Sequence, residues 1–491
     1  MATIDFEGSL KILHDLNATT WKGQPLVNSF FFDSYNVWQT FQAKLFVIVQ
    51  YQNPKEAPPS PSPQKLTFKF ALAGMLAICI SLLAYAVVII GRRRVLVYSM
   101  DKADSKFGSD ERLSHIYEAL TKNREPFIEV FHTLLDRDFR NNLLKRRRPA
   151  IYLESIDFIF LLLTKCGLIT IPKPDTLDIH RFVHANKQAL ARALFERCLY
   201  QFELFKFKAK ILSKLLRFTP VTHLLTIDEM RNYFELLYAC KKNGIKSYAF
   251  EHGSYTKYHV GWLKAPGVQG KILKPDKLFV WSPYWKRELL EFGTYFENDE
   301  IVIGGRKEGT ISAWESKVRK ENFTGITILI PHERAASKRE VKRFIEAFLA
   351  CGARVLFKVR PSVGRVRQLA DYELHEREGD LLQVVENMDA IENADFVAGS
   401  TSSLLYDAVA HKKPVIYLKT GVTLDERLVA NDLAEPLALE DDICAKLESF
   451  THILQSKLLE RRTKLLGESK TRSADVLYGI MEEVRQSKTK R

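Results

Sequence analysis

The sequence predicts a two-lobed α/β fold in which each lobe is a parallel sheet covered by helices. Short β-branched or apolar runs alternate with longer helical patterns from residue 95 onward, as expected of strands joined by crossover helices. The alternation runs to about residue 250 and then restarts. A chain of 491 residues also exceeds what one hydrophobic core normally holds, which favours two lobes.

The first unit contains four expected strands and three expected helices. Such strands are apolar along their whole length because a parallel sheet is buried on both faces. The expected strands are Val95–Tyr98, Ala150–Leu153, His223–Ile227 and Lys246–Phe250. The expected helices begin at about Ser109, span Leu177–Phe218 and span Asp228–Lys242.

The second unit repeats this arrangement and closes with an apolar strand. Its expected strands are Lys277–Trp281, Glu300–Ile303, Gly325–Ile330, Arg354–Val359, Leu382–Val385, Ala394–Ala398 and Pro414–Leu418. Helices are expected from about Lys338 to Cys351 and from Ser402 onward. Two Rossmann-like lobes in succession predict a ligand cleft between them, at the carboxyl ends of the strands.

A long apolar run precedes the two units. Phe70–Ile90 holds no charged residue over 21 positions, and a helix of that length rises ~31 Å, enough to cross the hydrocarbon core of a bilayer. Arg92, Arg93 and Arg94 follow it, so the positive-inside rule puts the following part in the cytoplasm. The sequence therefore predicts a single-pass protein of the inner membrane with a cytoplasmic catalytic part and membrane lipid as a partner.

These observations divide the chain into six parts. Residues 1–54 form a small N-terminal region of unknown role, 55–69 a proline-rich linker and 70–91 the transmembrane helix. Residues 92–270 form the N-terminal, acceptor lobe, 271–475 the C-terminal, donor lobe and 476–491 a basic tail.

Charge and cysteine usage narrow the function further. The formal net charge is +14, but no helix-turn-helix, zinc-finger or RNP pattern accompanies it, so nucleic acid is not the expected partner. Anionic lipid or a phosphorylated donor fits the charge as well. The six cysteines lie far apart with no metal-ligand spacing, which suits a reducing compartment and argues against disulfides and a zinc site.

The strongest motif is ADFVAGSTSSLLYD at residues 394–407, where a strand ends at a glycine and a helix begins after four hydroxyl residues. Free N–H groups and the positive end of a helix dipole attract anions, so we expect phosphates there. An N-cap without a ligand is the alternative. The expected donor-binding residues are Ser400, Thr401, Ser402 and Ser403, with Asp407 placed to accept hydrogen bonds from ribose hydroxyls.

Three other strand ends carry cations. Lys358 and Arg360 leave one strand before a proline, Gly305 and Arg306 follow another, and Arg334 follows a third in PHER. Arginine makes forked contacts with phosphate and lysine neutralises it as a point charge, so these residues are also expected to bind donor phosphates. A surface strand edge is the alternative for Lys358 and Arg360.

The loop after the last strand of the first unit reads FEHGSYTKYHVG. His252 lies at the carboxyl end of that strand beside a glycine, and the ordinary pKa of histidine suits a general base. Glu251 is the alternative base, and Lys257 is expected on the acceptor side.

The order of these motifs resembles that of the GT-B-type transferases of bacterial surface polymers. The likeness is to the CDP-glycerol glycerophosphotransferases and capsule-polysaccharide transferases, and it covers about residues 246 to 420. It implies a GT-B-like fold with His252 as base and with Lys257 at the position of the lysine in that family's His-Gly segment. It also implies that Lys358–Pro361 and Ser400–Asp407 bind the donor. Arg360 stands where that family has a histidine, and Ser400 and Thr401 replace an Asp-Tyr pair, which favours a sugar donor over glycerol phosphate.

The expected function is therefore that of a membrane-anchored glycosyltransferase that uses a nucleotide-activated sugar to build or modify a cell-surface polysaccharide. No cofactor or metal is expected, since no DxD motif follows a strand. The partners would be a nucleotide-sugar donor and a glycan or lipid-linked acceptor, while the oligomeric state stays open. The alternatives are a CDP-glycerol-type glycerophosphotransferase, a nucleotide-sugar 2-epimerase and a non-catalytic scaffold of an envelope-polymer assembly.

Overall fold

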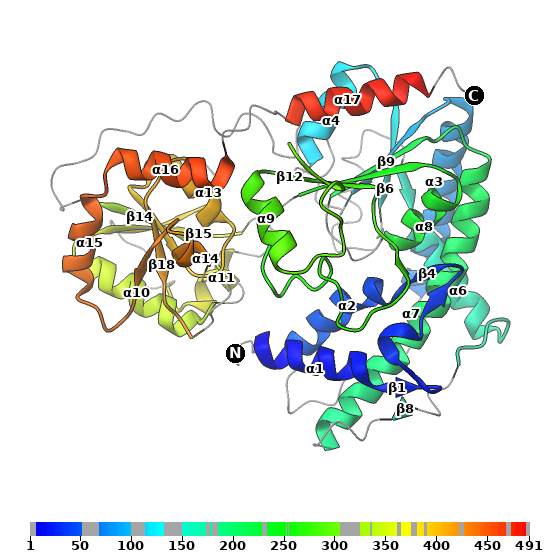
Figure 1. The fold of residues 1–491 in the computed structure, drawn as a ribbon, viewed down its shortest axis with the longest axis horizontal. Helices are drawn as coiled ribbons and strands as arrows, with labels where there is room; N and C mark the ends of the chain where they lie inside the picture. The colour runs from blue at the N-terminus through cyan, green and yellow to red at the C-terminus, as the bar shows by residue number, and fades with distance from the viewer. Residues whose placement is uncertain are drawn as a thin grey trace.

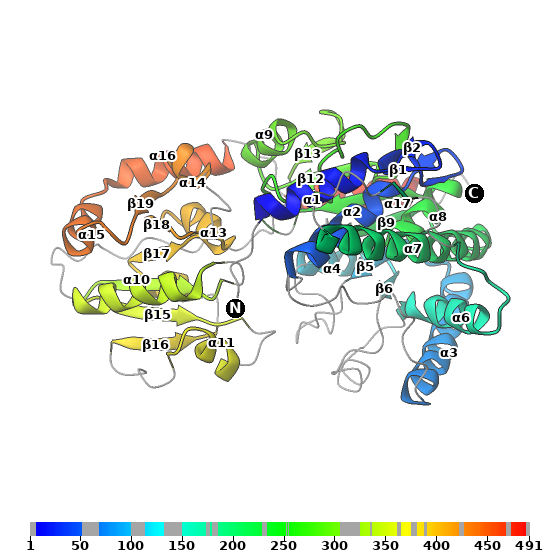
Figure 2. The same cartoon turned by 90° about the horizontal axis from the view of Figure 1, so that it is seen from below.

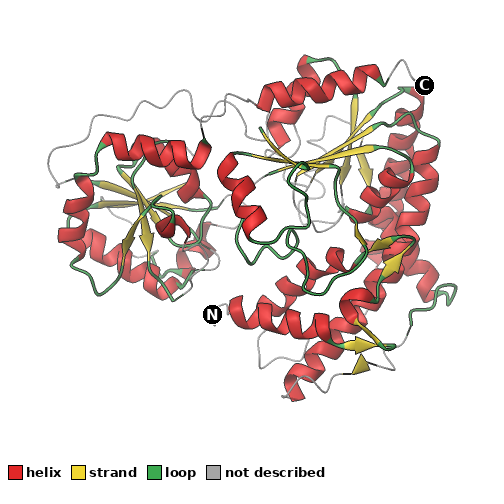
Figure 3. Cartoon of the chain, viewed as in Figure 1, coloured by secondary structure: helices red, strands yellow, loops and turns green. Residues whose placement is uncertain are grey.

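The computed structural model folds the chain into two α/β lobes and an N-terminal region that packs on the first lobe (Figure 1). It describes residues 6–487 except 52–67, 100–112, 132–149, 173–176, 179–184, 228–232, 252, 254, 305–324, 334–335, 361–364, 375–380, 387–389, 422–426 and 468–472. Figure 3 shows strands at the centre of each lobe with helices around them.

The first lobe is built on a parallel sheet of seven strands in the order β13-β12-β10-β9-β5-β6-β7. The strands are β5 (Val95–Ser99), β6 (Phe127–Phe131), β7 (Ala150–Tyr152), β9 (His223–Ile227), β10 (Lys246–Phe250), β12 (Lys277–Val280) and β13 (Ile301–Ile303). Its helices are α4 (Ser114–Lys122), α6 (Glu154–Lys165), α7 (Ala185–Arg217), α8 (Phe234–Lys242) and α9 (Pro283–Glu291).

The second lobe has a parallel sheet of six strands in the order β16-β15-β14-β17-β18-β19. The strands are β14 (Thr327–Pro331), β15 (Arg354–Lys358), β16 (Leu382–Val385), β17 (Phe396–Gly399), β18 (Val415–Leu418) and β19 (Glu435–Leu437). Its helices are α10 (Lys338–Ala350), α11 (Arg365–Asp371), α12 (Ala390–Asn393), α13 (Leu404–Ala410), α14 (Arg427–Ala430), α15 (Ile443–Thr451) and α16 (Gln455–Leu466).

Burial follows the pattern that a parallel sheet demands. Every residue of β14 is buried, as its continuous apolar run predicts. Helix α10 instead buries Val341, Phe344, Ile345 and Phe348, the i, i+3, i+4, i+7 stripe of a helix that covers a sheet.

The boundary between the lobes lies later in the chain than the sequence indicated. We expected the second lobe to begin at residue 271, but β12 and β13 are hydrogen-bonded into the first sheet. The second lobe therefore begins after Ile303, with β14 as its first strand. In addition, α17 (Ser473–Gln486) returns to the first lobe and packs beside α4, so most of the expected basic tail is a structural helix (Figure 1).

The N-terminal region holds α1 (Phe6–Ala18), α2 (Trp38–Tyr51) and several short elements. These are η1 (Leu26–Asn28) and two small sheets, one of β1 (Thr20–Trp21), β2 (Gln24–Pro25) and β8 (Leu177–Asp178), the other of β3 (Phe31–Phe32), β4 (Tyr35–Asn36) and β11 (Lys271–Ile272). Both sheets thus combine strands of the N-terminal region with a strand of the first lobe. Its buried side chains belong to the same core as those of the first lobe.

The apolar run forms α3 (Phe68–Ile90), a helix that packs on the first lobe beside β7 and α6 (Figure 2). Within the described part of the chain, no helix meets the requirements of length and apolarity for a membrane span. Gly74 of α3 lies so close to Phe158 that a Cβ atom would come within 2.4 Å of its ring. The Tyr152 N–H donates to Ser81 Oγ at 2.9 Å, and Tyr85 Oη donates to the Leu215 carbonyl at 2.7 Å.

The prediction of a spanning helix that separates residues 1–54 from the catalytic part is therefore wrong. The segments before and after α3 share one core and two small sheets, which a bilayer between them would not permit. The prediction failed because an uninterrupted apolar run also suits a helix laid against a lobe. In α3, Ala77, Ala84 and Val88 are buried, whereas Leu83 and Ile90 stay exposed.

The expectation of unpaired cysteines also needs a correction. Cys351, at the C-terminal end of α10, and Cys444, in α15, form a disulfide with their Cα atoms 5.5 Å apart. The two cysteines are 93 residues apart in sequence, so their spacing gave no sign of the pairing. Cys79, Cys166, Cys198 and Cys240 are free.

Candidate functional site

The carboxyl ends of β10 and β12 are tied together by Glu251. Its side chain is 3% exposed, and its Oε2 accepts a hydrogen bond from the Trp281 N–H at 2.6 Å. The Trp281 indole Nε1–H donates in turn to the Glu251 carbonyl at 3.0 Å. Glu251 therefore holds the backbone around the loop that carries His252, a residue that itself lies outside the described part.

The loop that follows is held by the N-terminal region. Lys257, expected on the acceptor side, forms an ion pair with Glu7 of α1. Tyr258 Oη donates to the same carboxylate at 2.6 Å, and burial together with this bond raises the pKa of Tyr258 to about 12. His259 Nδ1 accepts the Thr256 N–H at 3.0 Å, so it shapes the loop.

Glu333 occupies the anion site that the sequence predicted at the Ser400–Ser403 turn. This carboxylate is fully buried and follows β14. It accepts hydrogen bonds from the N–H groups of Ser400 at 2.9 Å, Thr401 at 2.7 Å and Ser402 at 2.8 Å, and from Ser400 Oγ at 2.8 Å. A Cβ at Gly399 would come within 2.7 Å of Glu333 Oε1, which explains the glycine at the end of β17.

The turn is therefore an anion site, as the motif indicated, but its ligand is the protein's own carboxylate. Burial raises the pKa of Glu333, and the hydrogen bonds from the turn oppose this by stabilising its charged form. Helix α13 is only seven residues long. The hydroxyl groups of the half-buried Thr401 and Ser402 and of the exposed Ser403 are the groups of the turn that another ligand could contact.

An exposed arginine lies beside this network. Arg360 follows β15, and its Nε donates to the His332 carbonyl at 3.2 Å. The Gln368 side chain bonds both the N–H and the carbonyl of Arg360 at 2.7 Å, which fixes the backbone. His332 is buried, and burial, together with the charges of Lys338 and Arg360, lowers its pKa to about 4, so its ring is neutral at pH 7. The arrangement presents the exposed charge of Arg360 beside a neutral His332.

Aromatic side chains join the strand ends of the two lobes. The Tyr255 ring lies 5.8 Å from Trp285 in the first turn of α9, and Trp285 lies 4.6 Å from Tyr406 in the first turn of α13. Arg427 of the second lobe also bonds Glu288 of α9 at 2.9 Å. The loop after β10 and the helix that follows the Ser400–Ser403 turn are thus linked through Trp285 of α9.

The structure brings together some of the predicted site residues. Arg360 lies against His332, whose neighbour Glu333 bonds Ser400, Thr401 and Ser402. Lys358 is half-buried at the end of β15, and its carbonyl accepts the His332 N–H at 2.7 Å. Ser403 and Asp407 lie at the start of α13. His252, Gly305, Arg306 and Arg334 lie outside the described residues.

Sequence reasoning missed Glu333 and His332 as members of this network. The PHER segment was singled out for its arginine, because an anion site was expected to recruit cations. A carboxylate directly after a buried strand was the available signal for Glu333. For a metal, no group of three suitable His, Cys, Asp or Glu side chains is found among the described residues.

Comparisons with known proteins give structural likenesses but no sequence relatives. No protein-family model and no curated protein matches the chain. Among solved structures it is similar to the UDP-GlcNAc 2-epimerase from Methanocaldococcus jannaschii (13% identity, 79% of this chain, 99% of that chain, TM-score 0.42). It is also similar to the wall teichoic acid polymerase TagF (12%, 85%, 98%, 0.46) and to the glycosyltransferase of kitacinnamycin (10%, 80%, 99%, 0.46).

By their names, these three structures are an epimerase, a polymerase and a glycosyltransferase. With identities of 10–13% and TM-scores under 0.5, we draw no conclusion about activity from them.

Proposed function

We propose that the protein is a glycosyltransferase that moves a sugar from a nucleotide-activated donor to a hydroxyl group of a glycan or lipid-linked acceptor. The observation that carries this proposal is the strand-end network of the second lobe. There, the exposed Arg360 bonds the carbonyl of His332, and the next residue, Glu333, bonds the Ser400–Ser403 turn. A strand-end position is where open α/β sheets bind nucleotides.

The donor phosphates would then rest on side chains and not on the backbone N–H groups of the turn. Glu333 takes the N–H groups of Ser400, Thr401 and Ser402. Its negative charge close by makes a cation necessary before a diphosphate can bind, which is the role we assign to Arg360. Such a charge also stabilises the nucleotide as it leaves.

On the acceptor side we propose His252 as the general base that deprotonates the attacking hydroxyl. Glu251 fixes the backbone before it through the bonds to Trp281. Gly253 has no atom within 4 Å of where a Cβ would lie, which leaves room for an acceptor. The location on a membrane and the contact with lipid stay predictions from the sequence.

Arg360→Ala tests the donor site. Loss of a charge-assisted contact should weaken nucleotide binding by about 1–3 kcal/mol, measured by calorimetry with UDP, GDP, CDP and CMP. Arg367→Ala, an exposed arginine on the neighbouring α11, is the matched control and should bind normally. Equal nucleotide affinity in the wild type and Arg360→Ala would show that the phosphate site lies elsewhere.

The products separate the alternatives. A glycosyltransferase releases nucleotide from a nucleotide sugar only with an acceptor, whereas a 2-epimerase changes the sugar without one. Turnover of CDP-glycerol but of no nucleotide sugar would indicate the glycerophosphotransferase. A scaffold would turn over none of these substrates.

A further inference from the structure

A cavity of about 310 Å³ lies between helices of the first lobe and α2 of the N-terminal region. It is separate from the strand-end network of the second lobe. Its lining combines apolar and polar side chains, with three cations against two carboxylates. The apolar residues are Phe41, Leu45, Ile48, Cys198 and Leu204, and the polar ones are Lys44, Asp157, Arg197, Gln201, Lys208 and Glu235.

Lys208 of α7 engages both carboxylates. Its side chain is 1% exposed, and its Nζ lies 2.8 Å from Asp157 Oδ1 and 3.9 Å from Glu235 Oε1. Burial alone would lower the pKa of Lys208, but the two carboxylates raise it above its ordinary value. Lys208 offsets one of the two negative charges, and the lining as a whole carries three cations against two carboxylates.

Lys44 is influenced by the same two carboxylates but, unlike Lys208, forms no ion pair with them within the described part of the chain. The Nζ of Lys44 lies 3.5 Å from Gln201 Oε1, at the limit of a hydrogen bond. Burial lowers the pKa of Lys44, as do Lys208 and Arg197, against the opposing effect of Glu235 and Asp157. Among the described residues, Arg197 takes part in no hydrogen bond or ion pair. The excess of one positive charge, together with Arg197, favours an anion in this partly open cavity.

We propose that this cavity binds a small organic anion, with a carboxylate or phosphate headgroup on an apolar body. The headgroup would lie between Lys44 and Arg197, where it supplies the missing negative charge. The apolar body would lie on the wall that Phe41, Ile48 and Leu204 form.

Occupancy would also steady the loop after β10. Gln39 and Gln42 lie on α2, in the turns before Lys44, and both donate to the Val260 carbonyl, at 2.8 and 2.7 Å. Gln39 also donates to the Leu263 carbonyl at 2.7 Å. A ligand that fixes α2 therefore restrains the segment that contains Lys257.

The experiment is calorimetry on the full chain with octanoate, octyl phosphate and octanol as probes. Octanoate or octyl phosphate should bind, and the preferred one identifies the headgroup. Octanol has the same tail without the charge, so its affinity should be lower by about tenfold or more. Equal binding of octanol would overturn the proposal, as would no binding of either anion.

Variants locate the site. Lys44→Met and Arg197→Met should weaken anion binding about tenfold or more, while Lys44→Arg keeps the charge and should retain it. Lys214→Met removes an exposed cation from the same α7 and should change nothing. Unchanged affinity in both Met variants would overturn the site. Slower hydrogen exchange over residues 255–272 with bound octanoate is expected, and no change there would refute the link through α2.

Discussion

Glu333 shows how a single residue changes the meaning of a motif. A turn of four hydroxyl residues before a helix predicts an anion site, and the structure contains one, filled by a carboxylate from the neighbouring strand. Sequence alone shows the donors of such a site but not which acceptor reaches them, because the acceptor comes from a residue 67 positions away. Glu333 therefore sets both the shape and the charge of the turn.

Removal of this carboxylate should be costly. Glu333→Ala leaves the buried N–H of Ser400 and the half-buried N–H groups of Thr401 and Ser402 without their acceptor, so we expect the free energy of unfolding to fall by about 3 kcal/mol or more. Urea unfolding measures this. Glu340→Ala is the control, because Glu340 accepts one exposed bond from the Gly421 N–H at 2.9 Å and should cost under ~1 kcal/mol.

Inorganic phosphate provides a second test of this site with the same variant. If the turn is an anion site, phosphate should raise the melting temperature of Glu333→Ala more than that of the wild type, since it can replace the carboxylate. A variant as stable as the wild type would show that the network contributes little.

At the scale of elements, all eleven strands expected from apolar runs are present within a few residues of their predicted bounds. The run-and-turn pattern is strong where a strand is buried on both faces, as in β9 and β14. β6 was missed although it is fully buried, because its FIEVF sequence is interrupted by Glu129. The two-residue strands of the small sheets are set by tertiary contacts and leave no periodic signal.

Helix α17 is the element whose role the sequence hid. Its basic end suggested a solvated tail, yet Leu477, Ile480, Met481 and Val484 are buried in the core of the first lobe with α4. Glu483 accepts bonds from Lys246 Nζ at 2.6 Å and Tyr248 Oη at 2.7 Å, at the β10 strand. The helix therefore closes one face of the first sheet.

Deletion of residues 473–491 should destabilise the first lobe strongly. Four buried aliphatic side chains at about 1.5–3 kcal/mol each correspond to roughly 6 kcal/mol or more. Thermal unfolding should show a lower melting temperature, with apolar dye binding at the exposed core. A chain that lacks only residues 488–491 is the control, and a normal melting temperature for the longer deletion would contradict the packing described.

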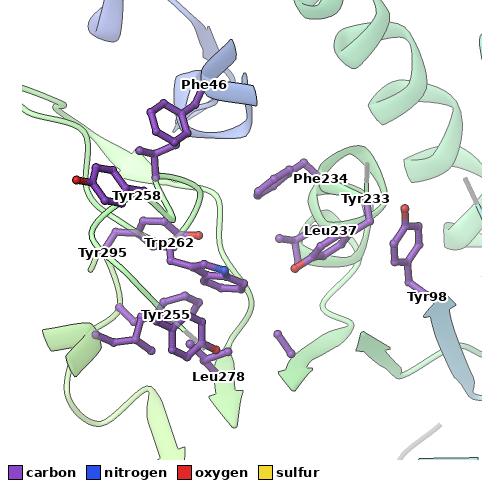
Figure 4. Packing of buried hydrophobic residues seen from close by; sticks show 14 of the residues in the cluster. Phe46, Tyr98, Tyr233, Phe234, Leu237, Tyr255, Tyr258, Trp262, Leu278 and Tyr295 are labelled. Carbon is purple, nitrogen blue, oxygen red and sulfur yellow. The ribbon is translucent and has the colours of Figure 1, made fainter. Parts of the chain in front are cut away.

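At the scale of the whole molecule, the N-terminal region is part of the first lobe. Figure 4 shows Phe46 of α2 in one cluster with Tyr255, Tyr258 and Trp262 of the loop after β10. Asn36 donates to the Gln269 carbonyl at 3.0 Å and pairs through β4 with β11. The two-lobed fold was predictable from local patterns. The position of residues 6–51 was not, because it depends on contacts between segments over 200 residues apart.

Chemical cross-linking decides between this arrangement and a membrane between the two segments. A carbodiimide joins a carboxylate to an amine without a spacer, so the two groups must come into contact, as they do in an ion pair. Glu7 with Lys257 and Asp33 with Lys242, the latter at 2.9 Å, are such pairs across the boundary. Peptide mapping of the intact protein in its native cells should find both cross-links. Lys257→Gln should abolish the first and leave the second, which serves as its internal control. If neither cross-link forms in cells or in the purified chain, residues 6–51 do not pack on the first lobe, and a membrane between the two segments is again compatible with the data.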